Sequence, residues 1–97
     1  MKLIWTPEAE KDRLDVLDYI AVDDPAAALR MNRVFQLAAE RAATFPMAAR
    51  AGDVPGTREL IPHPHYRLVY QIKGEAVWIL GIIHTARQWP PAGDGTS

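Results

Sequence analysis

The sequence contains no cysteine, and its longest apolar stretch is far shorter than a membrane span. Without cysteine, the chain can form no disulfide framework, no thiolate nucleophile and no cysteine-ligated zinc site. A transmembrane helix requires roughly 20 consecutive apolar residues, and residues 1–7 lack the basic and apolar regions of a secretory signal. We therefore expect a cytoplasmic protein without a membrane partner, and the absence of cysteine fits a reducing compartment.

Lysine is scarce as well, and most of the positive charge comes from arginine. The net charge is −1, but residues 1–24 carry three basic and seven acidic side chains, whereas residues 25–97 carry eight basic and five acidic ones. Arginine suits bidentate contacts with carboxylate or phosphate groups. A pI near 6.3 argues against a protein that binds nucleic acid tightly and without specificity. Any anionic partner is therefore expected to meet a local arginine patch.

Two helix-start signals lie near the N-terminus. Thr6 can cap a helix whose first residue is Pro7, and Asp24 can cap a second helix that begins at Pro25. Pro46 ends the second helix, and the short connection predicts an antiparallel helical hairpin. Helical spacing places the aspartates of the first helix in water, namely Asp12, Asp15 and Asp18. In the second helix it predicts a core stripe of Met31, Val34, Phe35, Ala38, Ala42 and Phe45.

Four segments are rich in aliphatic, β-branched or aromatic residues and predict strands: 2–5, 57–61, 66–72 and 76–84. Lys73-Gly74 fits a two-residue hairpin turn, which would pair Tyr70 with Val77. Because alternate residues point to opposite faces of a sheet, this register sorts the side chains into two sets. One set, facing the helices, is Tyr66, Leu68, Tyr70, Ile72, Val77, Ile79 and Ile83. The other set, on an exposed and partly apolar face, is Arg67, Val69, Gln71, Trp78, Leu80, Ile82 and His84.

The order of these elements predicts an α+β fold, in which an N-terminal strand precedes an antiparallel helical hairpin packed on a small antiparallel β-sheet. One domain is expected over residues 1–91. The small polar residues 92–97 predict a disordered tail. An exposed, partly apolar sheet face indicates a protein partner.

Several strings resemble the RelE/ParE toxins of bacterial type II toxin–antitoxin pairs, most closely the ParE-like branch. They follow the family's order and together span roughly residues 2–91. The strings are Ile4-Trp5-Thr6-Pro7-Glu8-Ala9, Tyr19-Ile20-Ala21, Asp24-Pro25-Ala26-Ala27-Ala28, Gly56-Thr57-Arg58-Glu59-Leu60, Tyr66-Arg67-Leu68-Val69-Tyr70, and Ile79-Leu80-Gly81-Ile82-Ile83-His84 with Arg87-Gln88-Trp89-Pro90.

The resemblance implies a toxin that inhibits growth by binding and poisoning DNA gyrase, without chemistry of its own. It also implies a cognate antitoxin that forms a hetero-oligomeric complex, wraps the toxin surface with its C-terminal segment and alone contacts operator DNA. No metal or organic cofactor is implied. His63 and His65 flank Pro64, but two histidines without a further matched ligand favour an exposed turn over a metal site.

A second activity stays open, because RelE-like members cut messenger RNA on the ribosome. Metal-independent RNA cleavage needs a general base, a general acid and cations near the developing phosphorane charge. Arg67 and His84 share the predicted outer face, and Arg87 follows, so these residues would supply half of such a site. RelE-type sites, however, resemble lysine and arginine clusters with a C-terminal tyrosine, and no tyrosine follows Tyr70. The ParE-like reading is therefore favoured, and an inactive interaction module is a third alternative.

Arginine and aromatic side chains are the usual anchors of protein interfaces. The candidates for contact with the target or the antitoxin are Arg67, Trp78, His84, Arg87 and Trp89, followed by Arg50 and Arg58. Structural roles compete with these interpretations. Arg67 can form an ion pair with Glu59 or Glu75 on a neighbouring strand, while His84 and Trp89 can order the C-terminal turn.

Overall fold

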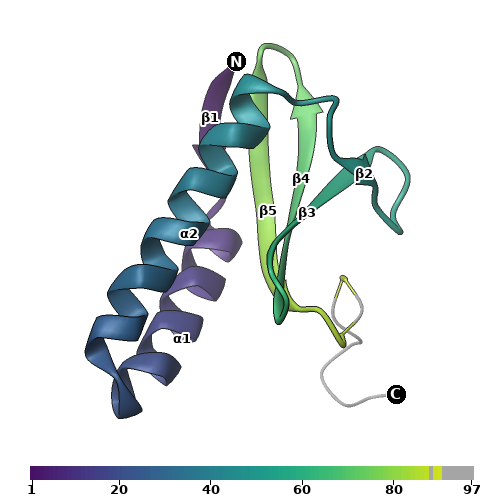
Figure 1. The fold of residues 1–97 in the computed structure, drawn as a ribbon. Coiled ribbons are helices and arrows are strands. Elements are labelled where there is room, and N and C mark those ends of the chain that lie inside the picture. The colour runs from purple at the N-terminus through teal and green to yellow at the C-terminus, as the bar shows by residue number, and fades with distance from the viewer. Residues whose placement is uncertain (88, 91–97) are drawn as a thin grey trace.

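The computed structural model describes residues 1–87, 89 and 90, so the tail predicted at 92–97 lies outside the described residues. Two helices pack side by side on one face of a curled five-stranded sheet (Figure 1). The elements are β1 (Lys2–Trp5), α1 (Pro7–Asp23), α2 (Pro25–Thr44), β2 (Arg50–Ala51), β3 (Thr57–His63), β4 (Tyr66–Lys73) and β5 (Ala76–His84). Within the described residues, neither helix combines the length and the apolar character needed to span a membrane.

Both predicted helix starts are confirmed. The hydroxyl of Thr6 accepts a hydrogen bond from the backbone N–H of Ala9 at 3.1 Å. The carboxylate of Asp24 accepts one from the backbone N–H of Ala27 at 3.0 Å. Each helix then begins with proline, which has no N–H to leave unpaired at this position. Because Asp24 alone separates α1 from α2, the chain reverses direction and forms the expected helical hairpin (Figure 1).

Arg13 ties the two helices together. Its guanidinium donates hydrogen bonds to Asn32 Oδ1 at 2.8 Å and Gln36 Oε1 at 3.0 Å, both on α2. The same group lies 4.6 Å from the ring centroid of Trp5 in β1, which is a cation–π geometry. One half-buried arginine therefore links β1, α1 and α2.

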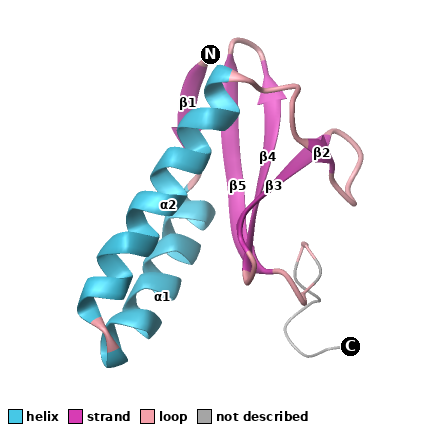
Figure 2. Cartoon of the chain, viewed as in Figure 1, coloured by secondary structure: helices cyan, strands magenta, loops and turns pink. Residues whose placement is uncertain are grey.

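The predicted α+β fold is confirmed, and the sheet has the order β1-β5-β4-β3-β2 (Figure 2). β1 runs parallel to β5, whereas the other pairs are antiparallel, so the sheet is mixed rather than purely antiparallel. The two-residue strand β2 falls in a segment predicted as loop, because so short a strand leaves no periodic signal in the sequence.

The register predicted for the β4–β5 hairpin is wrong. Lys73 pairs with Ala76, so the loop is Gly74-Glu75, and Gly74 has the positive φ of 61° that glycine adopts without strain. A bulge follows, since Tyr70 pairs with Ile79 whereas Val69 pairs with Gly81. The extra residue in β5 reverses the side-chain alternation beyond it. Three side chains therefore change face from the prediction: Ile82 and His84 lie on the helix side, and Ile83 lies on the opposite side.

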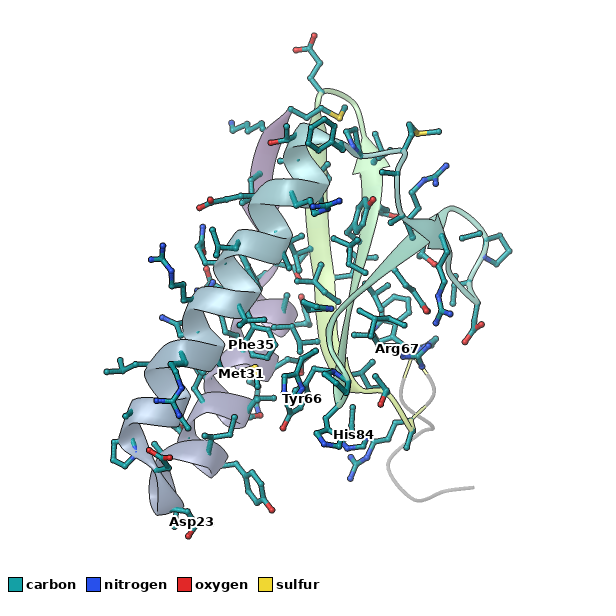
Figure 3. The ribbon with its side chains drawn as sticks, in the orientation of Figure 1. Asp23, Met31, Phe35, Tyr66, Arg67 and His84 are labelled. Carbon is teal, nitrogen blue, oxygen red and sulfur yellow. The ribbon has the colours of Figure 1, made fainter. Side chains whose placement is uncertain are left out.

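The core lies between the helices and the sheet. Phe35 is fully buried and meets the ring of Tyr66 edge-on, with centroids 5.8 Å apart (Figure 3). The other buried positions of α2 are all alanine, which lets the helix approach the sheet closely. The predicted core stripe holds for Phe35, Ala38 and Ala42 but is wrong for Phe45, whose side chain is 59% exposed. The helix ends at Thr44, so Phe45 leaves the helical periodicity.

The prediction of an open apolar face opposite the helices is also wrong. Val69 is fully buried, and Arg67 and Glu59 are 7% and 4% exposed. The segment after β2 folds across these residues, where Gly52 donates a backbone hydrogen bond to Thr57 at 2.8 Å. A Cβ atom at Gly52 would lie 2.3 Å from the Thr57 hydroxyl, so only glycine permits this close approach. Loop packing that depends on such a contact has no periodic signature in sequence.

Candidate functional site

A groove of about 810 Å³ runs between α1 and the C-terminal half of β5, and we refer to it as the α1–β5 groove. It exists because β1 covers β5 only as far as Ile79. Helix α1 forms one wall, with Asp12, Asp15 and Tyr19, and the end of β5 with the segment after it forms the other, with His84, Arg87 and Trp89. The structure therefore brings together three of the predicted contact residues with three residues of α1.

Asp12 closes the edge of β5 where β1 ends. Thr6 donates its backbone N–H to the Ile79 carbonyl at 3.1 Å, and farther along β5 the N–H of Ile82 donates to Asp12 Oδ2 at 3.1 Å. Burial raises the pKa of the Asp12 carboxyl above its ordinary value, against the opposing effect of the Ile82 hydrogen bond. The prediction that Asp12 faces water is thus wrong, while Asp15 and Asp18 are exposed as predicted.

The raised pKa of Asp12 predicts a pH-dependent stability. Between the ordinary pKa and the higher folded-state pKa, the folded chain binds more protons than the unfolded chain, so stability falls as pH rises through this window. Asp12→Asn keeps an acceptor for the Ile82 N–H but cannot ionise. We expect Asp12→Asn to melt at a higher temperature than the wild type at pH 7, and the difference to vanish below the ordinary pKa.

Thermal melts followed by circular dichroism measure this effect between roughly pH 3 and pH 7, a range that includes the ordinary titration of aspartate. Asp18→Asn, on the exposed side of the same helix, is the matched control. A lower melting temperature for Asp12→Asn than for the wild type at pH 7 would show that the ionised carboxylate stabilises the fold.

His84 is the last residue of β5, and Trp89 lies in the segment that follows this strand. The Nδ1 atom of His84 accepts a hydrogen bond from the Ala86 N–H at 3.1 Å, and the ring stacks on His65 with centroids 5.7 Å apart. Trp89 is half-buried against Gly81, where an added Cβ would lie 2.8 Å from the indole Nε1. His84 therefore orders the turn after β5, and the bare backbone of Gly81 makes room for Trp89.

Arg67 lies on the other side of the sheet, away from the helices (Figure 3). Its Nη1 donates to both carboxylate oxygens of Glu59 at 3.1 Å, and Asp53 lies 3.7 Å away. Its Nη2 donates to the backbone carbonyl of Arg87. The predicted ion pair with Glu59 is confirmed, whereas the predicted sharing of one face with His84 is wrong, because the bulge in β5 turns His84 to the helix side.

The remaining predicted residues lie outside the groove. Arg50 is exposed and binds Glu59 at 3.0 Å, beside the Arg67 pair. Arg58 donates to the Ala49 carbonyl at 2.8 Å and so holds the chain between α2 and β2. Trp78 is half-buried next to the β4–β5 turn. Among residues 1–87, 89 and 90, no three histidine, aspartate or glutamate side chains gather in a way that could hold a metal ion.

A second groove, of about 470 Å³, lies between α2 and β3, and we refer to it as the α2–β3 groove. Strand β2 pairs with β3 only at Arg58 and Glu59, so within the described chain the following part of β3 has a free outer edge. The walls are mainly apolar and include Val34, Leu37 and Arg41 from α2 with Leu60, Ile61 and Pro62 from β3. No local pattern in the sequence marks this groove, because it joins segments far apart in the chain.

Sequence reasoning missed Asp12 and Tyr19 as residues of a site. Asp15 and Tyr19 follow Asp12 by three and seven residues, so all three share one side of α1. That spacing was visible, but nothing in it showed that this side of α1 lies beside an uncovered strand edge.

Similarity to known proteins agrees with the fold and the arrangement of the chain. Over 90 residues the chain is 33% identical to the protein Y4kP of Sinorhizobium fredii, covering 92% of this chain and 93% of that one. It is 34% identical over 86 residues to the toxin RelE2 of Caulobacter vibrioides, covering 89% and 97%. Both relatives are matched over nearly their whole length.

Two solved structures share the fold. The chromosomal ParDE toxin–antitoxin system of P. aeruginosa superposes with a TM-score of 0.77 at 26% identity, covering 87% of this chain and 95% of that chain. The YoeB/ParE toxin of Agrobacterium tumefaciens gives 0.61 at 21% identity, covering 87% and 98%. The family described as the ParE toxin of the type II toxin–antitoxin system parDE matches residues 3–89. The chain therefore belongs to the ParE toxin family, as the toxin of a type II toxin–antitoxin pair whose partner is a cognate antitoxin.

Proposed function

We propose that this chain inhibits growth by binding and poisoning DNA gyrase, as a protein-binding toxin without chemistry of its own. The observation that carries the proposal is the burial of Arg67. Arg67 is 7% exposed, and its guanidinium is paired with the carboxylate of Glu59. A cation that stabilises a phosphorane must face the substrate, and Arg67 does not.

The separation of Arg67 from His84 supports the same conclusion. General acid–base cleavage of RNA requires its groups within hydrogen-bond reach of one phosphate. Arg67 points to the far face of the sheet, whereas His84 lies on the helix side next to Tyr66. The described residues instead offer two grooves with aromatic and aliphatic walls, which suit protein partners.

The α2–β3 groove is the surface that we assign to the antitoxin. Its walls are apolar, Leu37 is 50% exposed, and the free edge of β3 can pair with an extended segment. Helix α2 carries three arginines, Arg30, Arg33 and Arg41, against the single acidic residue Glu40. An amphipathic antitoxin segment with acidic residues complements this surface in both polarity and charge.

The target is tested by inducing the chain without its antitoxin and mapping DNA breaks and messenger RNA ends in parallel. Purified chain should also inhibit supercoiling by purified gyrase. We expect broken DNA, an SOS response and intact transcripts. New transcript ends within codons, with gyrase unaffected, would contradict the proposal and identify an RNA-cleaving toxin.

A further inference from the structure

The two helices of the hairpin differ in charge. Helix α1 carries six acidic and two basic side chains, whereas α2 carries three basic and one acidic. Each helix forms one wall of a different groove. The charged side chains that α1 contributes to the α1–β5 groove are Asp12 and Asp15, whereas α2 contributes Arg41 to the α2–β3 groove, so the two helix walls favour partner segments of opposite charge.

Asp12 and Asp15 place two carboxylates along the α1 wall. Only Oδ2 of Asp12 takes part in the hydrogen bond from Ile82, and the groove approaches this half-buried carboxylate from the open side. The carboxylate of Asp15 binds Lys11 at 2.7 Å, but both side chains of this pair are largely exposed. An exposed pair of this kind contributes little free energy, so an incoming cation can displace Lys11.

Aromatic rings flank the two carboxylates. Tyr19 follows Asp15 by one helical turn and is 77% exposed, and Tyr66 and Trp89 line the same groove. Carboxylates bordered by aromatic faces favour guanidinium or ammonium groups, because the ion pair and the ring quadrupole attract the same charge. Exposed Arg87, just after β5, repels a second cation and restricts where the first can sit.

We propose that the α1–β5 groove is the target-binding surface of this toxin, and that it binds an extended protein segment through an arginine or lysine seated between Asp12, Asp15 and Tyr19. The identification of gyrase as the target rests on the proposed function, but the assignment of the α1–β5 groove as the toxic surface does not. Since the antitoxin is assigned to the basic α2–β3 groove, the two surfaces are separable by mutation.

Charge reversal at two aspartates of α1 gives a matched test. Asp15→Arg changes the groove, whereas Asp18→Arg makes the same change on an exposed position of α1 that does not line it. Inhibition of supercoiling by purified gyrase is expected to weaken at least about tenfold for Asp15→Arg and less than about threefold for Asp18→Arg, as a hot-spot contact compared with a neutral surface site. Lys11→Ala controls for the loss of the exposed ion pair.

Both reversed variants should keep their affinity for the antitoxin within about threefold, which shows that they are folded. Equal loss of inhibition by Asp15→Arg and Asp18→Arg would overturn the proposal, and so would full activity of Asp15→Arg. If the wild type leaves gyrase unaffected, growth arrest on expression decides instead. Loss of arrest with Asp15→Arg but not with Asp18→Arg then supports the groove with a different target, and any other pattern, including a wild type that does not arrest growth, overturns it.

Discussion

Arg67→Met is expected to lower the free energy of unfolding by about 3 kcal/mol, because it leaves a buried carboxylate without its main partner. Glu59 is 4% exposed and accepts two hydrogen bonds from Arg67. Methionine fills much of the space but donates nothing. Folded domains of this size are typically stable by about 5–15 kcal/mol, so the loss would be a large share of the total. Urea unfolding followed by circular dichroism measures it.

Arg50 provides the matched control for this prediction. It binds the same carboxylate oxygen, Oε1 of Glu59, at 3.0 Å, but its side chain is mostly exposed. Arg50→Met should therefore lower stability by less than about 1 kcal/mol. Adding Glu59→Leu to Arg67→Met should restore part of the lost stability, since two apolar groups then replace the whole pair. Similar small losses for Arg50→Met and Arg67→Met would contradict the burial argument.

The same substitution has a consequence for the groove. Arg67 donates to the backbone carbonyl of Arg87, so the pair with Glu59 also anchors the segment that carries Arg87 and Trp89. Removing this anchor should speed amide exchange at residues 85–87 without affecting the caps of α1 and α2. Arg67, which the sequence predicted to contact a partner, therefore holds in place the residues that line the α1–β5 groove.

The parts of the fold that sequence predicted well are those set by local chemistry. Thr6 with Pro7, and Asp24 with Pro25, fix the starts of α1 and α2 through hydrogen bonds that span three residues. The β4–β5 register failed first at the turn, which is Gly74-Glu75 rather than Lys73-Gly74, and then at one extra residue, Leu80, whose placement is decided by packing along the whole hairpin. A shift of one position reverses the faces of Ile82, Ile83 and His84, and with them the predicted RNA-cleaving group.

The site was predicted in part for the same reason. His84, Arg87 and Trp89 follow one another closely in the chain, so their residue types alone indicated a contact region. Asp12 precedes Ile82 by 70 residues and belongs with this region only because β1 ends at Trp5, opposite Ile79, and leaves an edge of β5 for the Asp12 carboxylate. In an isolated helix Asp12 would face water, as predicted, but in the folded chain its side chain meets the edge of the sheet.

The apolar wall of the α2–β3 groove leads to the second large effect, on antitoxin affinity. Leu37→Asp places a carboxylate in the apolar wall beside Ile61 and Pro62, where it must be desolvated when the antitoxin binds. We expect the affinity for the antitoxin to fall by at least about 30-fold, equivalent to about 2 kcal/mol. Calorimetry with the purified antitoxin measures the change.

Leu29→Asp is the control on the same helix, because Leu29 is 73% exposed and does not line either groove. It should change the affinity by less than about threefold, as expected for a surface position outside an interface. Neither leucine lines the α1–β5 groove, so both variants should still arrest growth when expressed alone. Leu37→Asp should then be toxic even with the antitoxin present, whereas Leu29→Asp should be neutralised. If the antitoxin neutralises both variants equally, it binds elsewhere, and the acidic groove on α1 becomes the surface to test for it.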